Sequence, residues 1–172
     1  SLNRQVMNAA NLFAEGIDFG MRFRHPLGGG MFNAGAKVTY LLDKTTQAAP
    51  GTDSVIVREV TGYADPRVRG SFNVGYDTDH FTFGWFVRVH GSSVFNPDPT
   101  LSDEFYEDNS IRGAWYHDAS ISYKIDETYK LTFGINNVFD EKVPEFHANH
   151  NLNNGIYDSI GRYLFARINT KF

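Results

Sequence analysis

Residues 161–172 read GRYLFARINTKF and alternate strictly between two kinds of side chain. A period of two is typical of an extended strand, because successive side chains point to opposite faces of a sheet. One face of this segment carries Leu164, Ala166, Ile168, Thr170 and Phe172. The other carries Tyr163, Phe165, Arg167, Asn169 and Lys171. The segment therefore predicts a strand with one apolar face and one polar, partly basic face.

Six further segments follow the same rule, at 17–24, 32–42, 68–76, 81–89, 115–125 and 129–139. At roughly 9–12 residues, these segments are longer than the strands of about 5–6 residues that globular sheets use. They match the roughly 9–11 residues with which a tilted strand crosses a bilayer. No segment reads as a convincing helix, and no apolar run reaches the ~18 residues that a transmembrane helix needs.

The connections between these segments alternate in length. Short ones at 25–29, 77–80 and 126–128 interleave with long ones near 45–66, 92–113 and 140–160. Every short turn is therefore expected at one end of the strands and every long loop at the other. Outer-membrane β-barrels keep this parity, with short periplasmic turns and long extracellular loops.

Composition excludes several other classes of protein. The chain has 172 residues, of which 41% are hydrophobic and 21% charged, so it is not disordered. It contains no cysteine, which excludes disulfide frameworks and thiolate metal sites. A formal charge of −4 gives no net attraction to nucleic acid, and no nucleic-acid partner is expected. Aromatic residues make up 15% and gather near the predicted strand ends, as in the interfacial girdles of membrane barrels.

Charges of opposite sign are segregated along the chain. The predicted polar strand faces are basic, with Arg22, Arg24, Lys37, Arg69, Arg88, Lys124, Lys130 and Arg167 opposed mainly by Asp18 and Asp118. The long loops are acidic instead. We expect a basic wall that looks into an enclosed interior below an acidic mouth. Such a wall requires either counter-charge in the interior, which another part of the same protein could supply, or a wide water-filled interior.

Two motifs near the C-terminus resemble a known family. LTFGINNVFD at 131–140 resembles the penultimate-strand motif of TonB-dependent outer-membrane receptors. Residues 161–172 are similar to that family's closing strand, and Phe172 would be the C-terminal aromatic of the barrel assembly signal. PRVRG at 66–70, and NAA at 8–10 followed by GID at 16–18, are similar to the family as well. The resemblance covers nearly the whole chain.

The resemblance implies an all-β, antiparallel up-and-down transmembrane β-barrel. Residues 1–172 would supply about seven strands, the C-terminal part of a 22-stranded barrel, without the N-terminal plug domain and the earlier strands. The whole protein would lie in the outer membrane of a Gram-negative bacterium and bind a scarce solute, such as a ferric siderophore, cobalamin or an oligosaccharide. It would import that solute with energy from the TonB complex, which acts through the plug. The basic wall would then face the lumen and the plug.

The long loops suit a bulky polar solute, because they combine aromatic faces with amide groups. The candidate ligand-binding residues are Phe95, Phe105, Tyr106, His147, Asn149, His150, Asn151 and Tyr157. An acidic mouth disfavours an anionic chelate, whereas a basic lumen favours one, so the solute stays open. Alternatively, these loops pack against one another.

Metal binding and catalysis find little support. His147 and His150 have a spacing that can bind zinc or copper, but two histidines in a polar loop arise readily by chance. We expect no metal and no cofactor. No nucleophile elbow or phosphate-binding loop occurs, so no enzyme activity is expected.

Two other architectures are compatible with the alternation. A small, self-contained eight-stranded outer-membrane barrel with a structural or adhesion role would use residues 1–11 as its eighth strand. A soluble sandwich would instead bury the apolar face as its core.

Overall fold

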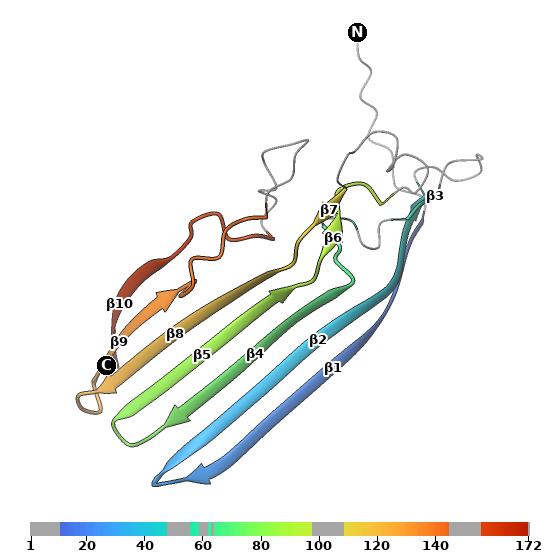
Figure 1. The fold of residues 1–172 in the computed structure, drawn as a ribbon. Coiled ribbons are helices and arrows are strands. Elements are labelled where there is room, and N and C mark those ends of the chain that lie inside the picture. The colour runs from blue at the N-terminus through green and yellow to red at the C-terminus, as the bar shows by residue number, and fades with distance from the viewer. Residues whose placement is uncertain are drawn as a thin grey trace.

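A computed structural model describes residues 11–47, 56–58, 62, 64–97, 109–144 and 156–171. Seven long strands form one antiparallel sheet in which each strand pairs with its neighbour along the chain (Figure 1). They are β1 (Asn11–Leu27), β2 (Gly30–Gln47), β4 (Val68–Asp77), β5 (Phe81–His90), β8 (Ala114–Lys124), β9 (Tyr129–Asn136) and β10 (Tyr163–Thr170). This order confirms the predicted all-β, up-and-down arrangement of about seven strands.

Three short strands lie within the predicted long connections. β3 (Ile56–Arg58) pairs with the end of β2, and β6 (Ser93–Val94) pairs with β7 (Ser110–Ile111) in a separate two-stranded sheet. All three lie at one end of the large sheet, whereas the tight turns lie at the opposite end (Figure 1). The sequence predicts these connections as loops throughout, because strands of two or three residues carry no measurable period.

The first hairpin is longer than predicted at its turn. The sequence assigned 25–29 to a connection, but His25, Pro26 and Leu27 continue β1, and only Gly28 and Gly29 turn the chain. Both glycines have positive φ angles, 54° and 83°, which a two-residue hairpin turn requires and which other residues rarely adopt. Pro26 pairs with Met31, one position from the end of the hairpin.

The same hairpin also extends further at its other end. Gly16 pairs with Leu41 but Glu15 pairs with Asp43, so Leu42 is an extra residue that forms a β-bulge. Beyond the bulge, pairing continues to Asn11 and Gln47. Beyond a bulge, side chains that would lie on one face of the sheet lie on the other. The alternation in the sequence is therefore interrupted here, which is why it predicts these strands only over 17–24 and 32–42.

Two strands near the C-terminus are shorter than the sequence predicts. β9 ends at Asn136 rather than at 139, because Asn137 has a φ angle of 53° and leaves the strand conformation. β10 begins at Tyr163, after Gly161 at a φ of 79°, and ends at Thr170. Phe172, the proposed assembly signal, lies outside the described residues.

Cross-strand register keeps the two faces of the sheet chemically distinct. Along one row, Trp85 pairs with Ala119, Ala119 with Ile135, and Ile135 with Leu164. This apolar face stays open: Leu164 is 77% exposed and Ile168 67%. Within the described residues no second layer covers it, so the structure does not show the core that a soluble sandwich would place there.

The buried core is small and lies at the end of the sheet that carries β6 and β7. It consists of Ile111, Ala114, Tyr116 and Tyr157, against which Phe95, Val143 and Ile156 pack. No helix within the described residues is long and apolar enough to cross a membrane. The outer edges of β1 and β10 pair with no other described strand, so the sheet is open.

Candidate functional site on the concave face

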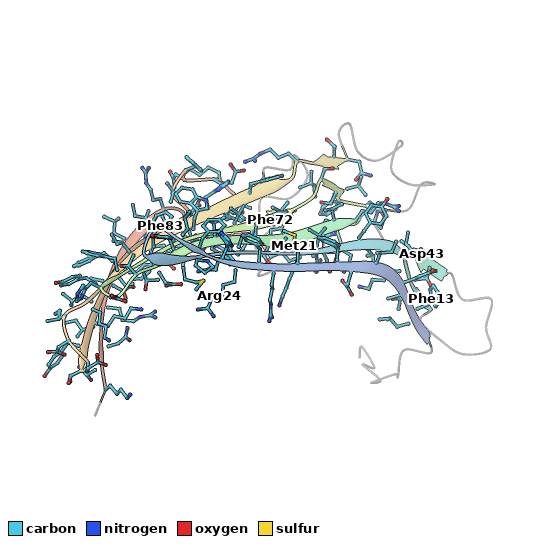
Figure 2. The ribbon with its side chains drawn as sticks, turned by 90° about the horizontal axis from the view of Figure 1, so that it is seen from below. Phe13, Met21, Arg24, Asp43, Phe72 and Phe83 are labelled. Atoms are coloured by element: carbon cyan, nitrogen blue, oxygen red, sulfur yellow. The ribbon has the colours of Figure 1, made fainter. Side chains whose placement is uncertain are left out.

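The sheet is curved, and its two faces therefore differ in shape as well as in chemistry. Figure 2 shows Arg24 on the concave side, whereas Met21, Phe72 and Phe83 lie on the opposite, convex side. Register extends this division across the sheet, because Met21 pairs with Ala36, which in turn pairs with Phe72. The convex face is therefore the apolar one and the concave face the polar one.

All eight predicted wall cations occupy the concave face. Arg22 and Arg24 pair with Gly35 and Asn33, and Lys37 pairs with Gly20 and Ser71. Register then places Arg69 opposite His90, Arg88 opposite Tyr116, Lys124 opposite Lys130, and Arg167 opposite Thr132. A shared face follows from the register alone, whereas the lumen and plug assignment stays a prediction.

Acidic side chains from β8 and from the connections neutralise part of this wall. Arg88 lies 3.4 Å from the carboxylate of Asp118 and 3.6 Å from that of Asp158. Arg69 lies 3.6 Å from Asp65, and Lys124 lies 2.8 Å from Glu127. Alternation opposes only Asp18 and Asp118 to the wall, because it cannot place the residues of a long connection on a face.

The other wall cations have no such partner among the residues that the structure describes. Among the described residues, Arg22, Arg24, Lys37, Lys130 and Arg167 form no ion pair. Three of these five lie on β1 and β2, and the other two lie on β9 and β10, so the cations without an ion pair lie toward both edges of the sheet. Arg167, on β10, lies over the ring of Phe165 at 5.9 Å from its centroid.

Small residues form a row across the middle of the concave face. Gly75 pairs with Gly84, Gly84 with Ser120, and Ser120 with Gly134, so the row crosses four adjacent strands. Larger side chains beside the row pack over the glycines. Oδ1 of Asn33 lies 2.6 Å from the position that a Cβ at Gly75 would take, and the ring of Phe165 occupies the space above Gly134.

Two cavities open on the concave face around this row. One has a volume of about 310 Å³ and is lined by Asn73, Gly75, Gly84, Phe86 and Ser120 among others. The second, of about 390 Å³, is lined by Arg22, Arg24, Asn33, Gly35 and Asn73. Between the cavities, Asn33 donates a hydrogen bond to Asp77 over 2.9 Å. The concave face thus offers amide groups, phenyl rings and two guanidinium groups to an occupant.

A buried cluster closes the concave face at its β6–β7 end. Tyr116 is fully buried, and the Arg88 guanidinium lies 5.3 Å from the centroid of its ring. The backbone N–H of Asp158 donates a hydrogen bond to the Tyr116 hydroxyl over 3.2 Å. The segment around Asp158 is therefore held against the sheet by a hydrogen bond and an ion pair together.

Two of the predicted ligand-binding residues fall within the described ranges, Phe95 and Tyr157. Tyr157 is only 4% exposed, and it packs in the small core, where Phe95 contacts the same cluster. This arrangement gives both rings a packing role, the alternative that the sequence left open, and their contact with a solute stays a prediction. The other six lie outside the described residues: Phe105, Tyr106, His147, Asn149, His150 and Asn151.

The GINNVFD stretch forms a tight corner between β9 and the segment that follows it. Asn137 is fully buried; its side chain donates to the Glu141 carbonyl over 2.9 Å, and its amide oxygen accepts from the Glu141 N–H over 2.8 Å. Its own N–H donates to Asp118 over 2.9 Å. Asp118 thus joins this corner to Arg88 on β5, a connection that the sequence does not reveal.

Asp140 completes the corner outside the strands. The Lys142 ammonium group bonds to its carboxylate at 2.7 Å, and the Arg162 N–H donates to it at 2.9 Å. These two hydrogen bonds hold the pKa of Asp140 below its usual value. Among the described residues, no group of three or more histidine, aspartate or glutamate side chains is placed to hold a metal ion.

Comparison with protein families identifies this architecture. The family model described as "TonB dependent receptor-like, beta-barrel" matches residues 2–138. The chain belongs to this family. No curated protein matches the chain. No solved structure matches it either.

Membership in the TonB-dependent receptor family explains why the sheet is open. Proteins of this family are outer-membrane receptors and transporters of Gram-negative bacteria rather than enzymes. The seven-stranded sheet is accordingly a partial barrel, whose curvature and chemically distinct faces agree with a barrel wall.

Proposed function

We propose that this chain forms the C-terminal part of the barrel of a TonB-dependent active transporter. The transporter binds a scarce solute outside the cell, namely a ferric siderophore, cobalamin or an oligosaccharide, and imports it with energy from the TonB complex. The chain itself carries out no chemistry. The observation that best supports this proposal is the pairing of an open apolar convex face with a basic concave face in one sheet of this family.

The convex face meets lipid in this proposal. Unpaired backbone N–H and C=O groups are unfavourable in hydrocarbon. In a barrel every backbone group pairs within the sheet, and the apolar side chains point outward to the lipid. The unpaired outer edges of β1 and β10 then pair with the remaining strands of the barrel. The end that carries β3, β6 and β7 faces outside the cell, and the tight turns face the periplasm.

The concave face looks into the lumen and contacts the plug. Five wall cations lack ion-pair partners among the described residues, and an enclosed positive surface favours an acidic partner. The matching face of the plug is therefore acidic. The TonB complex engages that plug, and the two cavities lie where a plug segment or a passing solute would contact the wall.

Uptake measurements in cells test the proposal. A strain that lacks the complete gene is compared with the same strain carrying it, using labelled ferric siderophores, cobalamin and oligosaccharides. We expect the gene to restore uptake of one class of solute, and a protonophore to abolish that uptake. If the gene restores no class, or if uptake persists with the protonophore, active transport is the wrong function.

A further inference from the structure

The two cavities of the concave face meet at a pair of amide side chains. Asn33 and Asn73 line both of them. Each amide lies over a glycine of the neighbouring strand: Oδ1 of Asn73 lies 2.5 Å from the position that a Cβ at Gly35 would take, and Oδ1 of Asn33 lies 2.6 Å from that at Gly75. Because these glycines have no side chains, both amides pack flat against the sheet. The cavities therefore share a low boundary, and together they form one groove across the sheet, the concave groove.

The β1 end of the concave groove is cationic. Arg22 and Arg24 line it, and neither forms an ion pair with the described residues. They are successive inward-facing residues of β1, about 7 Å apart along the strand, and Figure 2 shows Arg24 on the concave side. A guanidinium group binds a carboxylate through two parallel hydrogen bonds. This end therefore favours an occupant that carries a carboxylate.

The other end of the concave groove is aromatic and has an open floor. Phe86 and Phe165 line it, and Phe86 is 39% exposed. Gly84 and Ser120 form the floor, where a Cβ at Gly84 would meet only Oγ of Ser120 within 4 Å. A flat ring can therefore approach the backbone closely here. Phenyl rings supply a large apolar contact area, which suits the apolar C–H face of a sugar ring.

Hydrogen-bonding groups lie between the two ends. Both carboxylates that line the groove already have partners, because Asp77 accepts from Asn33 over 2.9 Å and Asp118 lies 3.4 Å from Arg88. The side-chain amide of Asn73 makes no hydrogen bond with the described residues. An amide both donates and accepts hydrogen bonds, and so does each hydroxyl group of a sugar. The middle of the groove is therefore suited to hydroxyl groups.

We propose that the concave groove binds a linear oligosaccharide that carries a carboxylate, with the carboxylate on Arg22 and Arg24 and a sugar ring over Gly84 and Ser120 beside Phe86. This inference rests on the proposed function and names its solute class. A linear chain of flat rings contacts both ends of such a shallow groove at once, whereas a rounded chelate contacts only one end. The competing occupant is a plug segment with an acidic side chain.

Uptake of a matched pair of sugars by the complete receptor in cells tests the proposal. The probes are a labelled uronic-acid trisaccharide and the same trisaccharide with its carboxyl groups reduced to alcohols. At concentrations below saturation we expect about tenfold faster uptake of the acidic sugar, the scale of one hydrogen bond to a charged group. Equal uptake of the two sugars would overturn the proposal.

A variant at the cationic end locates the carboxylate. Arg24→Gln is expected to reduce the preference for the acidic sugar about tenfold, to near equality. The readout is the ratio of the two uptakes, because a loosened plug changes both uptakes together. Lys37→Gln is the matched control, since Lys37 lies on the same face without an ion pair among the described residues and lines neither cavity. If Arg24→Gln lowers both uptakes equally, or if Lys37→Gln lowers the ratio as much, the groove does not bind the carboxylate.

A second variant tests the two amides. Gly35→Ala with Gly75→Ala must lift both amides off the sheet and raise the boundary inside the groove. Uptake of both sugars is expected to fall, with their ratio unchanged, while protease releases no more plug than from the parent. Gly20→Ala is the control, because a Cβ there meets nothing within 4 Å. A heat-modifiable gel shift establishes that each variant folds. Unchanged uptake, or a fall in uptake together with a loosened plug, would overturn the proposal.

Failure of this inference is distinguishable from failure of the transport proposal. If the receptor imports a ferric siderophore or cobalamin but neither sugar, the concave groove is wrong and active transport stands. If it imports no solute of any class, both proposals are wrong.

Discussion

Arg22 and Arg88 lie on the same concave face, but they differ in their ion pairs and in the side chains around them. Arg88 stands over the ring of Tyr116 and pairs with Asp118 and Asp158, the second of which comes from a distant connection. Arg22 lines an open cavity and forms no ion pair with the described residues. Near the β6–β7 end, positive charge holds the chain's own connection in place. The cations on β1 and β2 form no ion pair with the described residues, and their contact with the plug stays a proposal.

The largest effect is expected from breaking the cluster around Arg88. Replacing Tyr116 by alanine empties a fully buried position, which costs about 3–5 kcal/mol for large aromatic side chains. Chemical denaturation of the complete receptor in detergent measures the loss. Tyr129→Ala, on the exposed convex face, is the control and should cost far less. Similar losses for the two variants would show that the cluster is not a core.

A smaller effect is expected in the middle of the concave face. A Cβ at Gly134 would overlap the ring of Phe165, so Gly134→Ala must displace that ring at a cost of about 1–3 kcal/mol. Gly20→Ala is the matched control, since a Cβ there meets nothing within 4 Å. Denaturation midpoints compare the two variants. An equal shift would mean that Phe165 does not lie over Gly134.

Replacing each arginine in turn tests whether Arg88 and Arg22 have different roles. Arg88→Gln leaves Asp118 and Asp158 without their partner and should destabilise the receptor by about 1 kcal/mol, the scale of a partly exposed ion pair. Arg22→Gln should leave stability within experimental error but weaken retention of the plug. Protease release of the plug from purified receptor measures that retention. Equal plug release from both variants would contradict the assignment of separate roles.

The smallest effect is expected at Asp140. Its lowered pKa means that its bonds to Lys142 and Arg162 stabilise the folded state above the usual aspartate pKa, and that this contribution is lost as pH falls through the lowered pKa. Asp140→Asn should therefore melt at a lower temperature than the parent at neutral pH and approach it in acid. Thermal melts across pH provide the measurement, with Asp79→Asn on a short turn as the control. A constant difference at every pH would exclude this linkage.

Much of this architecture was predictable from local patterns. Alternation placed all seven long strands and assigned Arg22, Arg88 and Arg167 to one face, because the pleat of a strand sends neighbouring side chains to opposite sides. The family motif at 131–140 indicated the barrel correctly as well. The bulge at Leu42 and the hairpin of β6 and β7 were missed, since one breaks the alternation and the other is too short to show any.

The site depended on contacts that alternation cannot report. Nothing in the sequence brings Asp158 to Arg88, or aligns Gly75, Gly84, Ser120 and Gly134 in one row. Tyr157 illustrates the difficulty, because an aromatic residue in a long connection suits solute binding and core packing equally well. The structure packs it into the core.

The sequence by itself determined which side chains share a face and how many long strands the sheet has, because both follow from the geometry of a single strand. Only the tertiary structure decided which residues of different strands lie side by side, which loop acids neutralise the wall, and where the cavities open. Those features depend on cross-strand register and on loops folding back over a curved sheet, and both are set by contacts between residues far apart in the chain.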